Sequence, residues 1–415
     1  MHRRCNLAVE LYQGRARSIR LLWVRRRTPC RKGCAVTAIN GKARDHALIL
    51  RPAATAVTAI NADPHFDDWL KAVRVAVQTL VGDFVAVRCS PGLRAAGIDV
   101  AADVLDEFMT GGKCLRSTFM YLGWLCGADD DDAALRAAAS LELLHAFALL
   151  QDDVMDGSAL RRGRASGHVA FARWHEGRGL SGPPQRFGES AATLLADLCL
   201  VWAAQMMRES GMPAAALERL WPRYDAMCVE LAVGQFADLV NDAGGFPTLE
   251  QVLDIARLKS GNYTVRRPLE MGAAMAGCSR HVVTVLGCFG EDLGEAFQMR
   301  DDVLGIFGSP ALTGKPRGDD LAEHKATSVV AAAYELADPA QRRQLAELMR
   351  ARKLADNHVA RWQELIAATG AVERIESLID SRVQRALWWI DNDSINVGMR
   401  AALTNMAAAC TRRSR

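Results

Sequence analysis

The sequence predicts an all-α protein, with one large domain that follows a basic N-terminal extension. Apolar residues recur at helical spacing from residue 67 onward, as in the run that includes Trp69, Leu70, Val73 and Val77. No segment bounded by turn signals shows the clean alternation of apolar and polar residues that a strand would have. No repeat of fixed period is visible. Half of the 415 residues are hydrophobic, which is enough for one large core or two domains.

Loops rich in Gly, Pro or polar residues separate the helical segments. We expect helices at residues 67–84, 101–109, 115–126, 133–153, 189–210, 214–240, 250–277, 280–307, 325–336 and 339–352, with two or three more within 355–410. Loops are expected at residues 158–164 and 177–187, and a turn at 241–247. Thr248 is a candidate helix cap. The segment 133–153 is rich in Ala and Leu and is expected to be buried.

Residues 1–60 differ in charge from the rest of the chain. They contain 13 Lys and Arg against Glu10 and Asp45, whereas the net charge of the whole chain is only +3. The remainder is therefore acidic, and the overall charge gives no indication of nucleic-acid binding. We expect residues 1–60 to be a disordered extension, or sequence translated upstream of the true start, with an organellar transit peptide as the alternative.

The cysteines and the apolar segments both favour a cytoplasmic protein. Eleven Cys are scattered without a CxxC pair, which is typical of reduced thiols. No uninterrupted run of 18 apolar residues is present, so no membrane span is expected. The first residues lack the apolar stretch of a secretory signal.

The most informative cluster is acidic and lies at the end of the apolar segment 133–153. Asp152, Asp153 and Asp156 project within an arc of about 100° on a helix, and acidic groups at a helix C-terminus oppose the helix dipole. The cluster is either an exposed acidic helix end or a cation site. Oxygen ligands favour Mg²⁺, which bridges to substrate phosphates. The following Arg161 and Arg162 add the charge that a diphosphate needs.

A second acidic pair repeats this arrangement and favours the cation site. Asp301 and Asp302 lie on the predicted helix 280–307, and Gln298 precedes them on the same face. Lys315 follows, within Gly314-Lys315-Pro316. Two acidic clusters, each with nearby basic residues, can place a cation on a shared diphosphate.

Two further segments have the chemistry to bind a phosphate. Gly111 and Gly112 precede a predicted helix and allow close approach of an anion to backbone amides, while Lys113 and Arg116 supply charge. Such a segment alone is as often a surface loop. His145 lies two turns before the first acidic cluster, although a lone His on an apolar helix is more often a core residue.

These motifs, in this order, resemble the trans-isoprenyl diphosphate synthases of the polyprenyl synthetase family, from about His65 to the C-terminus. Beside the clusters above, the resemblance rests on Glu142-Leu143-Leu144-His145, Gly234-Gln235 with Asp238, Lys259-Ser260-Gly261-Asn262-Tyr263-Thr264, and Asp320-Leu321 with Lys325. It implies the isoprenoid synthase fold, a single bundle of antiparallel helices around a central cavity, with residues 61–415 as the catalytic domain. The pattern is most like that of actinobacterial geranylgeranyl diphosphate synthases.

The resemblance also implies a role for each candidate residue. The metal ligands would be Asp152, Asp153, Asp156, Asp301 and Asp302. Isopentenyl diphosphate would be bound by Lys113, Arg116, His145 and Arg162. The allylic diphosphate would be bound by Arg161, Lys259, Thr264, Gln298 and Lys315. Lys259 and the five Asp are the catalytic candidates, because they act on the charge that develops on the leaving diphosphate. The role of Lys325 stays open, since a Lys on a helix surface is common.

The sequence departs from the family pattern at three informative positions. Cys114 and Ser117 replace the usual Arg and Pro, which removes one cation. Gly305 stands where the second motif usually has its third Asp. We expect Asp301 and Asp302 to keep a cation there, because Mg²⁺ makes few protein contacts and completes its shell with water.

The implied activity is the head-to-tail trans condensation of isopentenyl diphosphate with an allylic diphosphate. Mg²⁺ is the implied cofactor, with three ions in the site and Mn²⁺ as a possible substitute, and the implied assembly is a homodimer. The allylic C–O bond ionises, the double bond of isopentenyl diphosphate attacks, and a proton is lost to the departing diphosphate. An apolar cavity excludes the water that would quench the cation.

Three alternatives stay open at this point. A class I terpene cyclase also uses an aspartate-rich motif with Mg²⁺, but near Asn241 and Asn392 the sequence lacks the Ser or Thr spacing of its second metal motif. A non-catalytic regulatory subunit would be expected to lose metal ligands. The same condensation with a C15 or longer product is the third alternative.

Product length is predicted from the two residues that precede the first motif by one helical turn. Phe147 and Ala148 are five and four residues before Asp152, and an aromatic residue followed by a small one at these positions resembles synthases of the C20 product. We therefore expect Phe147→Ala to lengthen the product, because the shorter side chain opens the path of the growing tail. Chromatography of the dephosphorylated alcohols measures the product length. An unchanged length would contradict the hypothesis that Phe147 limits the path of the growing tail.

Overall fold

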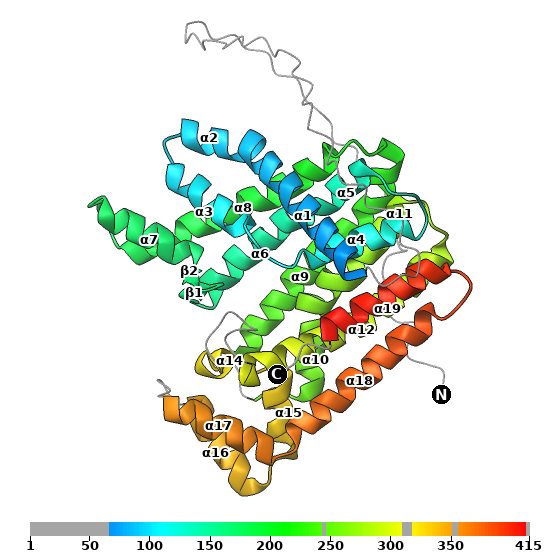
Figure 1. Ribbon diagram of the computed structural model, residues 1–415. Helices are drawn as coiled ribbons and strands as arrows, with labels where there is room; N and C mark the ends of the chain where they lie inside the picture. The colour runs from blue at the N-terminus through cyan, green and yellow to red at the C-terminus, as the bar shows by residue number, and fades with distance from the viewer. Residues whose placement is uncertain (1–65, 243–245, 309–317, 351–355, 412–415) are drawn as a thin grey trace, which may run out of the picture. The chain divides into compact units, whose positions relative to one another are not determined.

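The computed structural model describes residues 66–242, 246–308, 318–350 and 356–411. The described chain is almost entirely helical, as the periodicity predicted (Figure 1). The predicted extension at residues 1–60 and the candidate residue Lys315 lie outside the described residues.

The first half of the fold consists of helices joined by short turns. They are α1 (Phe66–Phe84), the π-helical turn η2 (Val85–Cys89), α2 (Ser90–Ala95), α3 (Asp99–Met109), α4 (Leu115–Leu125), α5 (Asp132–Ala139), α6 (Leu141–Met155), α7 (Gly167–Gly177), α8 (Pro184–Arg208) and α9 (Ala214–Asp242). Between α6 and α7, the strands β1 (Leu160–Arg161) and β2 (Arg164–Ala165) pair antiparallel.

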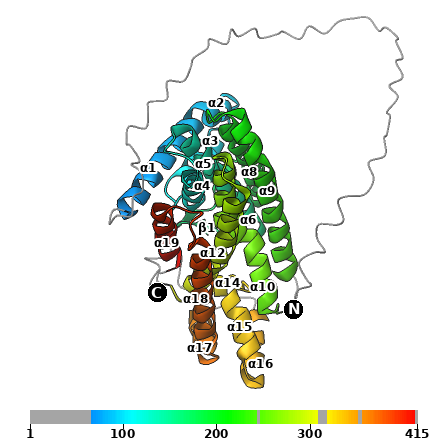
Figure 2. The ribbon, with the colours of Figure 1, turned by 90° about the vertical axis from the view of Figure 1, so that its right-hand side faces the viewer.

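The second half continues in the same way. It contains α10 (Leu249–Ala256), the π-helical segment η3 (Arg257–Arg266), α11 (Arg267–Met275), α12 (Arg280–Phe307), α14 (Asp319–Ala322), α15 (Ser328–Leu336), α16 (Pro339–Arg350), α17 (Asp356–Ala368), α18 (Ala371–Ile390) and α19 (Val397–Thr411). Within the described chain, α1 to α3 lie toward one end and α15 to α17 toward the other, as both views show (Figures 1 and 2).

Three predicted segments differ from the structure for local reasons. The predicted helix 133–153 is broken at Ser140, whose hydroxyl donates a 2.6 Å hydrogen bond to the carbonyl of Ala137. The predicted helix 250–277 is three elements, because Pro268 cannot donate to the preceding turn and the helix widens before it. The predicted loop 177–187 ends early, since Pro184 occupies the first turn of α8.

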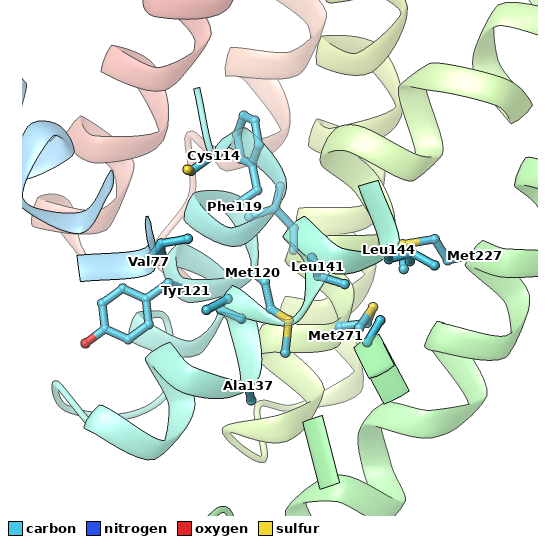
Figure 3. Packing of buried hydrophobic residues seen from close by; sticks show 14 of the residues in the cluster. Val77, Cys114, Phe119, Met120, Tyr121, Ala137, Leu141, Leu144, Met227 and Met271 are labelled. Atoms are coloured by element: carbon cyan, nitrogen blue, oxygen red, sulfur yellow. The ribbon is translucent and has the colours of Figure 1, made fainter. Parts of the chain in front are cut away.

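The larger of two apolar cores joins the first half of the fold to α11 and α12. Figure 3 shows part of it, including Phe119 and Met120 of α4, Leu141 of α6 and Met271 of α11. Here α4 and α11 pack at backbone distance, because a Cβ added at Gly272 would lie 1.8 Å from the carbonyl oxygen of Met120. Helix α6 joins this core through Leu141, Leu143 and Leu144, and its C-terminal end carries the first acidic motif.

A second, smaller core holds α12 against α14, α15, α17 and α18. Ion pairs add to it along α12 and α18, where Arg382 contacts Glu295 at 2.5 Å and Arg300 contacts Glu376 at 2.6 Å. The second acidic motif lies on α12 beside this core. Both acidic motifs are therefore carried by helices that are anchored over much of their length.

Two helical segments of the described chain are long and apolar enough to cross a membrane by composition alone. They are Asp132–Met155 and Pro184–Arg208, and the apolar 18-residue stretches within them are 61% and 39% buried. The first comprises α5 and α6 and contributes Leu141, Leu143 and Leu144 to the larger core. Burial of this kind gives a core helix the same composition as a membrane span.

Candidate active site

The first acidic motif lies at the C-terminal end of α6. Asp152 and Asp153 occupy its last turn and Asp156 follows immediately. The side chain of Asp153 is 1% exposed and that of Asp152 is 20% exposed. Because the carbonyl groups of this helix end are also negative, the three carboxylates need cationic partners.

Arg161 is the first of these partners and is delivered by the β1–β2 hairpin. Its Nε donates to Asp153 Oδ1 at 2.9 Å, and its Nη2 contacts Asp152 Oδ2 at 3.3 Å. Burial opposes the charge of Arg161, yet the hydrogen bond to Asp153 and both carboxylates raise its pKa. Burial raises the pKa of Asp153 despite this bond. Arg161, which was predicted to bind the allylic diphosphate, thus lies against the first motif.

Lys259 is the second partner. Its Nζ lies 3.1 Å from Asp152 Oδ1 and 2.7 Å from Asp238 Oδ2. Burial favours the neutral form of Asp152, but Lys259 and Arg161 together hold its pKa below the usual range. The backbone of η3 approaches α9 closely, because a Cβ at Gly234 would lie 2.5 Å from the amide nitrogen of Lys259. The predicted Gly234–Asp238 segment therefore positions this lysine.

Lys325 is the third partner, and the sequence left its role open. Its Nζ lies 3.0 Å from Asp156 and 2.9 Å from Glu323, whose carboxylate also accepts a 3.2 Å hydrogen bond from Ser158. Lys325 is not on a helix surface: it follows His324, which adopts a left-handed conformation, in the turn before α15. In the sequence, only the match of Lys325 to a family motif indicated that this lysine belongs to the site. Glu323 was not among the predicted residues.

The second acidic motif has neutral partners at Asp302. Gln298 Nε2 donates to Asp302 Oδ1 at 2.8 Å, and the amide and hydroxyl of Ser328 donate to Oδ2 at 2.9 and 2.5 Å. Burial raises the pKa of Asp302, against the effect of these hydrogen bonds. Asp301 lies beside it on α12 and is partly exposed. The sequence predicted Gln298 near the motif but missed Ser328.

The Gly-Gly-Lys segment packs against Arg162. Gly111 and Gly112 have positive φ angles of 84° and 82°, which L side chains rarely adopt. Arg162 Nη1 donates to the carbonyl of Thr110 at 3.1 Å, and a Cβ at Gly112 would lie 3.0 Å from Arg162 Nη2. Lys113 follows on the exposed side of this loop. The glycines thus let a guanidinium reach the loop that was predicted to bind a phosphate.

A polar cluster with unsatisfied hydrogen-bonding atoms lies close to this loop. The guanidinium of Arg116 stacks 4.2 Å from the ring centroid of Tyr263, and the ring of His145 lies 6.4 Å from that of Tyr263. Arg116 Nε, His145 Nδ1 and the Tyr263 hydroxyl are buried without a hydrogen-bond partner, as is the hydroxyl of Thr264. Buried donors of this kind fit a polar ligand. Tyr263 was part of a sequence motif but not of the predicted site.

A pocket between α1, α3 and α6 opens beside these residues. Gly111, Cys114, Glu142, His145 and Arg162 are among the residues that line it. Ser117, which replaces the family's Pro, donates a 2.8 Å hydrogen bond to Glu142. Of the residues predicted to bind isopentenyl diphosphate, His145 and Arg162 line this pocket, and Arg116 stacks nearby on Tyr263. Phe147 and Ala148 are partly exposed and pack against the larger core.

The carboxylates have the chemistry of a divalent-cation site. Among the described residues, no group of three or more His, Cys, Asp or Glu is gathered around one point as a preformed metal site. Asp153 Oδ2 is nevertheless buried without a hydrogen-bond donor, and the other first-motif oxygens face Arg and Lys side chains. An oxygen-only donor set with an unsatisfied buried oxygen fits Mg²⁺ better than a softer metal.

The environment of His145 predicts a pH effect on stability. Burial, together with Arg116, Arg162 and Arg161, holds the pKa of His145 well below its usual range. Below about pH 6.5 the unfolded chain therefore binds a proton here that the folded protein does not, so stability falls as the pH falls. When the pH falls from about 7 to about 5, the free energy of unfolding of the wild type should fall by about 1–2 kcal/mol more than that of His145→Gln.

Urea unfolding at several pH values measures this difference. His281→Gln is the matched control, because His281 is exposed near the start of α12, and it should follow the wild type. A pH dependence of His145→Gln that equals that of the wild type would show that this imidazole titrates normally in the folded protein.

Comparison with known proteins identifies the family of this chain. The Polyprenyl synthetase family model matches residues 99–366. Geranylgeranyl diphosphate synthase of Mycobacterium tuberculosis is 32% identical over 279 residues, which cover 67% of this chain and 74% of that protein. Geranylfarnesyl diphosphate synthase of Aeropyrum pernix is 30% identical over 281 residues, or 66% of this chain and 82% of that protein.

A solved structure agrees as well. The geranylgeranyl pyrophosphate synthase of Corynebacterium glutamicum, complexed with isoprenyl diphosphate and magnesium, superposes with a TM-score of 0.78 at 32% identity. The match covers 83% of this chain and 99% of that one. The predicted resemblance and the all-α isoprenoid synthase fold are confirmed, and the chain belongs to the polyprenyl synthetase family.

Proposed function

We propose that the protein is a Mg²⁺-dependent prenyltransferase that adds isopentenyl diphosphate head-to-tail to allylic diphosphates and releases geranylgeranyl diphosphate. One observation carries the proposal. The stretch 325–328, which leads into α15, contacts both acidic motifs, because Lys325 pairs with Asp156 of the first and Ser328 binds Asp302 of the second. The two motifs therefore face a common region lined with cationic side chains.

The protein residues account for binding of the allylic diphosphate. Mg²⁺, when bound, supplies positive charge that stabilises the leaving diphosphate. The ions would be held by the five motif carboxylates, Asp152, Asp153, Asp156, Asp301 and Asp302. Arg161, Lys259 and Lys325 already lie at the first motif, so they can exchange a carboxylate partner for a phosphate oxygen without leaving the site.

Isopentenyl diphosphate would occupy the pocket beside the Gly-Gly-Lys loop. His145 and Arg162 line this pocket, Arg116 stacks on Tyr263 close to His145, and Lys113, next to the lining residue Cys114, would add charge. Held there, the double bond attacks the allylic carbon as its C–O bond breaks. A new C–C bond forms, and the proton that is lost passes to the departing diphosphate, so no protein base is required.

A C20 product is the proposed length. Phe147 lies on α6 one turn before the first motif, where its ring can limit the tail that grows along this helix. Relatives with different names, a geranylgeranyl and a geranylfarnesyl diphosphate synthase, match the chain at similar identity. Length must therefore be measured, and the C15 or longer product is the alternative outcome.

We also propose a cytoplasmic location. All cysteines among the described residues are free thiols, including the buried Cys89, Cys114 and Cys199. Unpaired thiols are typical of proteins in a reducing compartment.

The test uses the full-length protein with isopentenyl diphosphate, MgCl₂ and, in turn, dimethylallyl, geranyl or farnesyl diphosphate. We expect a C20 alcohol to predominate after dephosphorylation, and chelation of Mg²⁺ to abolish elongation. Asp153→Asn should reduce turnover by at least about a hundredfold, whereas Asp83→Asn on the exposed face of α1 should not. Elongation that persists in Asp153→Asn, or fails in the wild type, would contradict the proposal.

Two exposed apolar stripes favour the homodimer. On α9, Val229, Val233 and Phe236 are 61%, 53% and 70% exposed and recur at helical spacing. On α8, Leu194 and Val201 are 65% and 59% exposed. Contiguous apolar faces of this kind mark protein interfaces, and a second copy of the chain offers the same face in return.

Charge placed in the α9 stripe should disrupt this dimer. We expect Val229→Glu to shift the protein toward the monomer in sedimentation velocity, because the carboxylate would be buried in the interface. Trp388→Glu is the matched control, since Trp388 is 67% exposed on α18, away from both stripes. A monomeric wild type, or a Val229→Glu dimer of unchanged stability, would contradict this assembly.

A further inference from the structure

The missing third aspartate of the second motif leaves a space that another carboxylate fills. Gly305 stands at that position on α12. A Cβ added to Gly305 would lie 1.8 Å from Asp320 Oδ2 and 2.5 Å from Asp320 Cγ. No side chain can occupy position 305 while Asp320 keeps this place, so the glycine and the carboxylate are structurally linked.

Asp320 is held in this position by its neighbours on α14. Leu321 is completely buried in the smaller core with Val303 and Ile306 of α12. The amide of Lys325 donates a 2.9 Å hydrogen bond to the carbonyl of Asp320, which closes the turn after α14. The carboxylate therefore meets the second motif because its backbone is anchored on both sides.

Asp320 also lies within electrostatic reach of the first motif. Burial opposes the charge of Lys325, but Asp156, Glu323 and Asp320 together raise its pKa. Lys325 Nζ is 3.0 Å from Asp156, so Asp320 lies against Gly305 of the second motif and also acts on the lysine that contacts the first. This is the region in which the allylic diphosphate is proposed to bind.

We propose that Asp320 supplies the third carboxylate of the second acidic motif and is a ligand for its divalent cation. The carboxylate comes from α14 instead of from position 305 of α12. A cation needs oxygen atoms at suitable distances, whatever segment carries them. The inference rests on the proposed function, because it assigns a residue to the metal site of that reaction.

The test moves the carboxylate from one segment to the other and measures metal binding. Mn²⁺ is titrated into full-length protein with inorganic pyrophosphate, and free Mn²⁺ is followed by electron paramagnetic resonance. We expect Asp320→Asn to weaken Mn²⁺ binding about tenfold to a hundredfold. The double variant Gly305→Asp with Asp320→Gly should recover to within about threefold of the wild type, because it restores one carboxylate in the same space.

The matched control is Gly305→Ala with Asp320→Gly, which fills the space without a carboxylate. It should bind Mn²⁺ as weakly as Asp320→Asn does. Wild-type binding by Asp320→Asn would overturn the inference, whether or not the double variants fold. Equally weak Mn²⁺ binding by the two double variants, when both have native circular dichroism spectra, would also overturn the inference. Primer elongation by the wild type is assayed separately, so a failure of the proposed reaction is distinguishable from a failure of this metal ligand.

Discussion

The clustering of three carboxylates at the C-terminal end of one apolar helix is the constraint on which the rest of the site depends. Repulsion among Asp152, Asp153 and Asp156 adds to the negative end of the helix dipole, and burial of Asp153 makes the charge harder to solvate. Three separate segments each contribute one cationic partner. Arg161 comes from the β1–β2 hairpin, Lys259 from η3 and Lys325 from the turn before α15. The positions of these segments therefore follow from the charge of α6 as much as from the packing of their own apolar side chains.

Close backbone packing is what brings these cations within reach. The approach of η3 to α9 requires Gly234, where a Cβ would overlap the backbone at Lys259. Arg162 approaches its loop at Gly112 for a different reason, since this residue has a φ angle of 82° that L side chains rarely adopt. Glycine within α9 lowers helix stability by about 1 kcal/mol relative to Ala. Here that loss is offset by a charged side chain placed beside a carboxylate or a phosphate loop, where a charge-assisted hydrogen bond contributes about 1.5–3 kcal/mol.

The sequence predicts the features that depend on neighbours along the chain. Helical periodicity locates the long helices, and the spacing of Asp152 and Asp156 predicts a cation site before any contact is known. What it could not predict depends on contacts between distant segments. Ser158 and Glu323 are 165 positions apart but share a hydrogen bond, and Ser328 reaches Asp302 across 26 positions. The π-helical form of η3 was also missed, because a single Pro268 decides it within a segment that otherwise has the pattern of a regular helix.

The two acidic motifs differ in how the protein compensates their charge, and this difference has a consequence for cation binding. At the first motif, Arg and Lys side chains pair with the carboxylates. At the second, the partners of Asp302 are the neutral donors Gln298 and Ser328. Arg300 is close in sequence, but it lies about 200° from Asp302 around the helix, and both of its Nη atoms bind Glu376 of α18, at 2.8 and 2.6 Å. The pairing of α12 with α18 thus keeps a cation away from Asp302. Burial raises the pKa of Asp302, and the proposed divalent ion would meet neutral donors at this carboxylate, where at the first motif it would meet a lysine or an arginine. The smaller core, through the pairing of Arg300 with Glu376, therefore leaves Gln298 and Ser328 as the partners of Asp302.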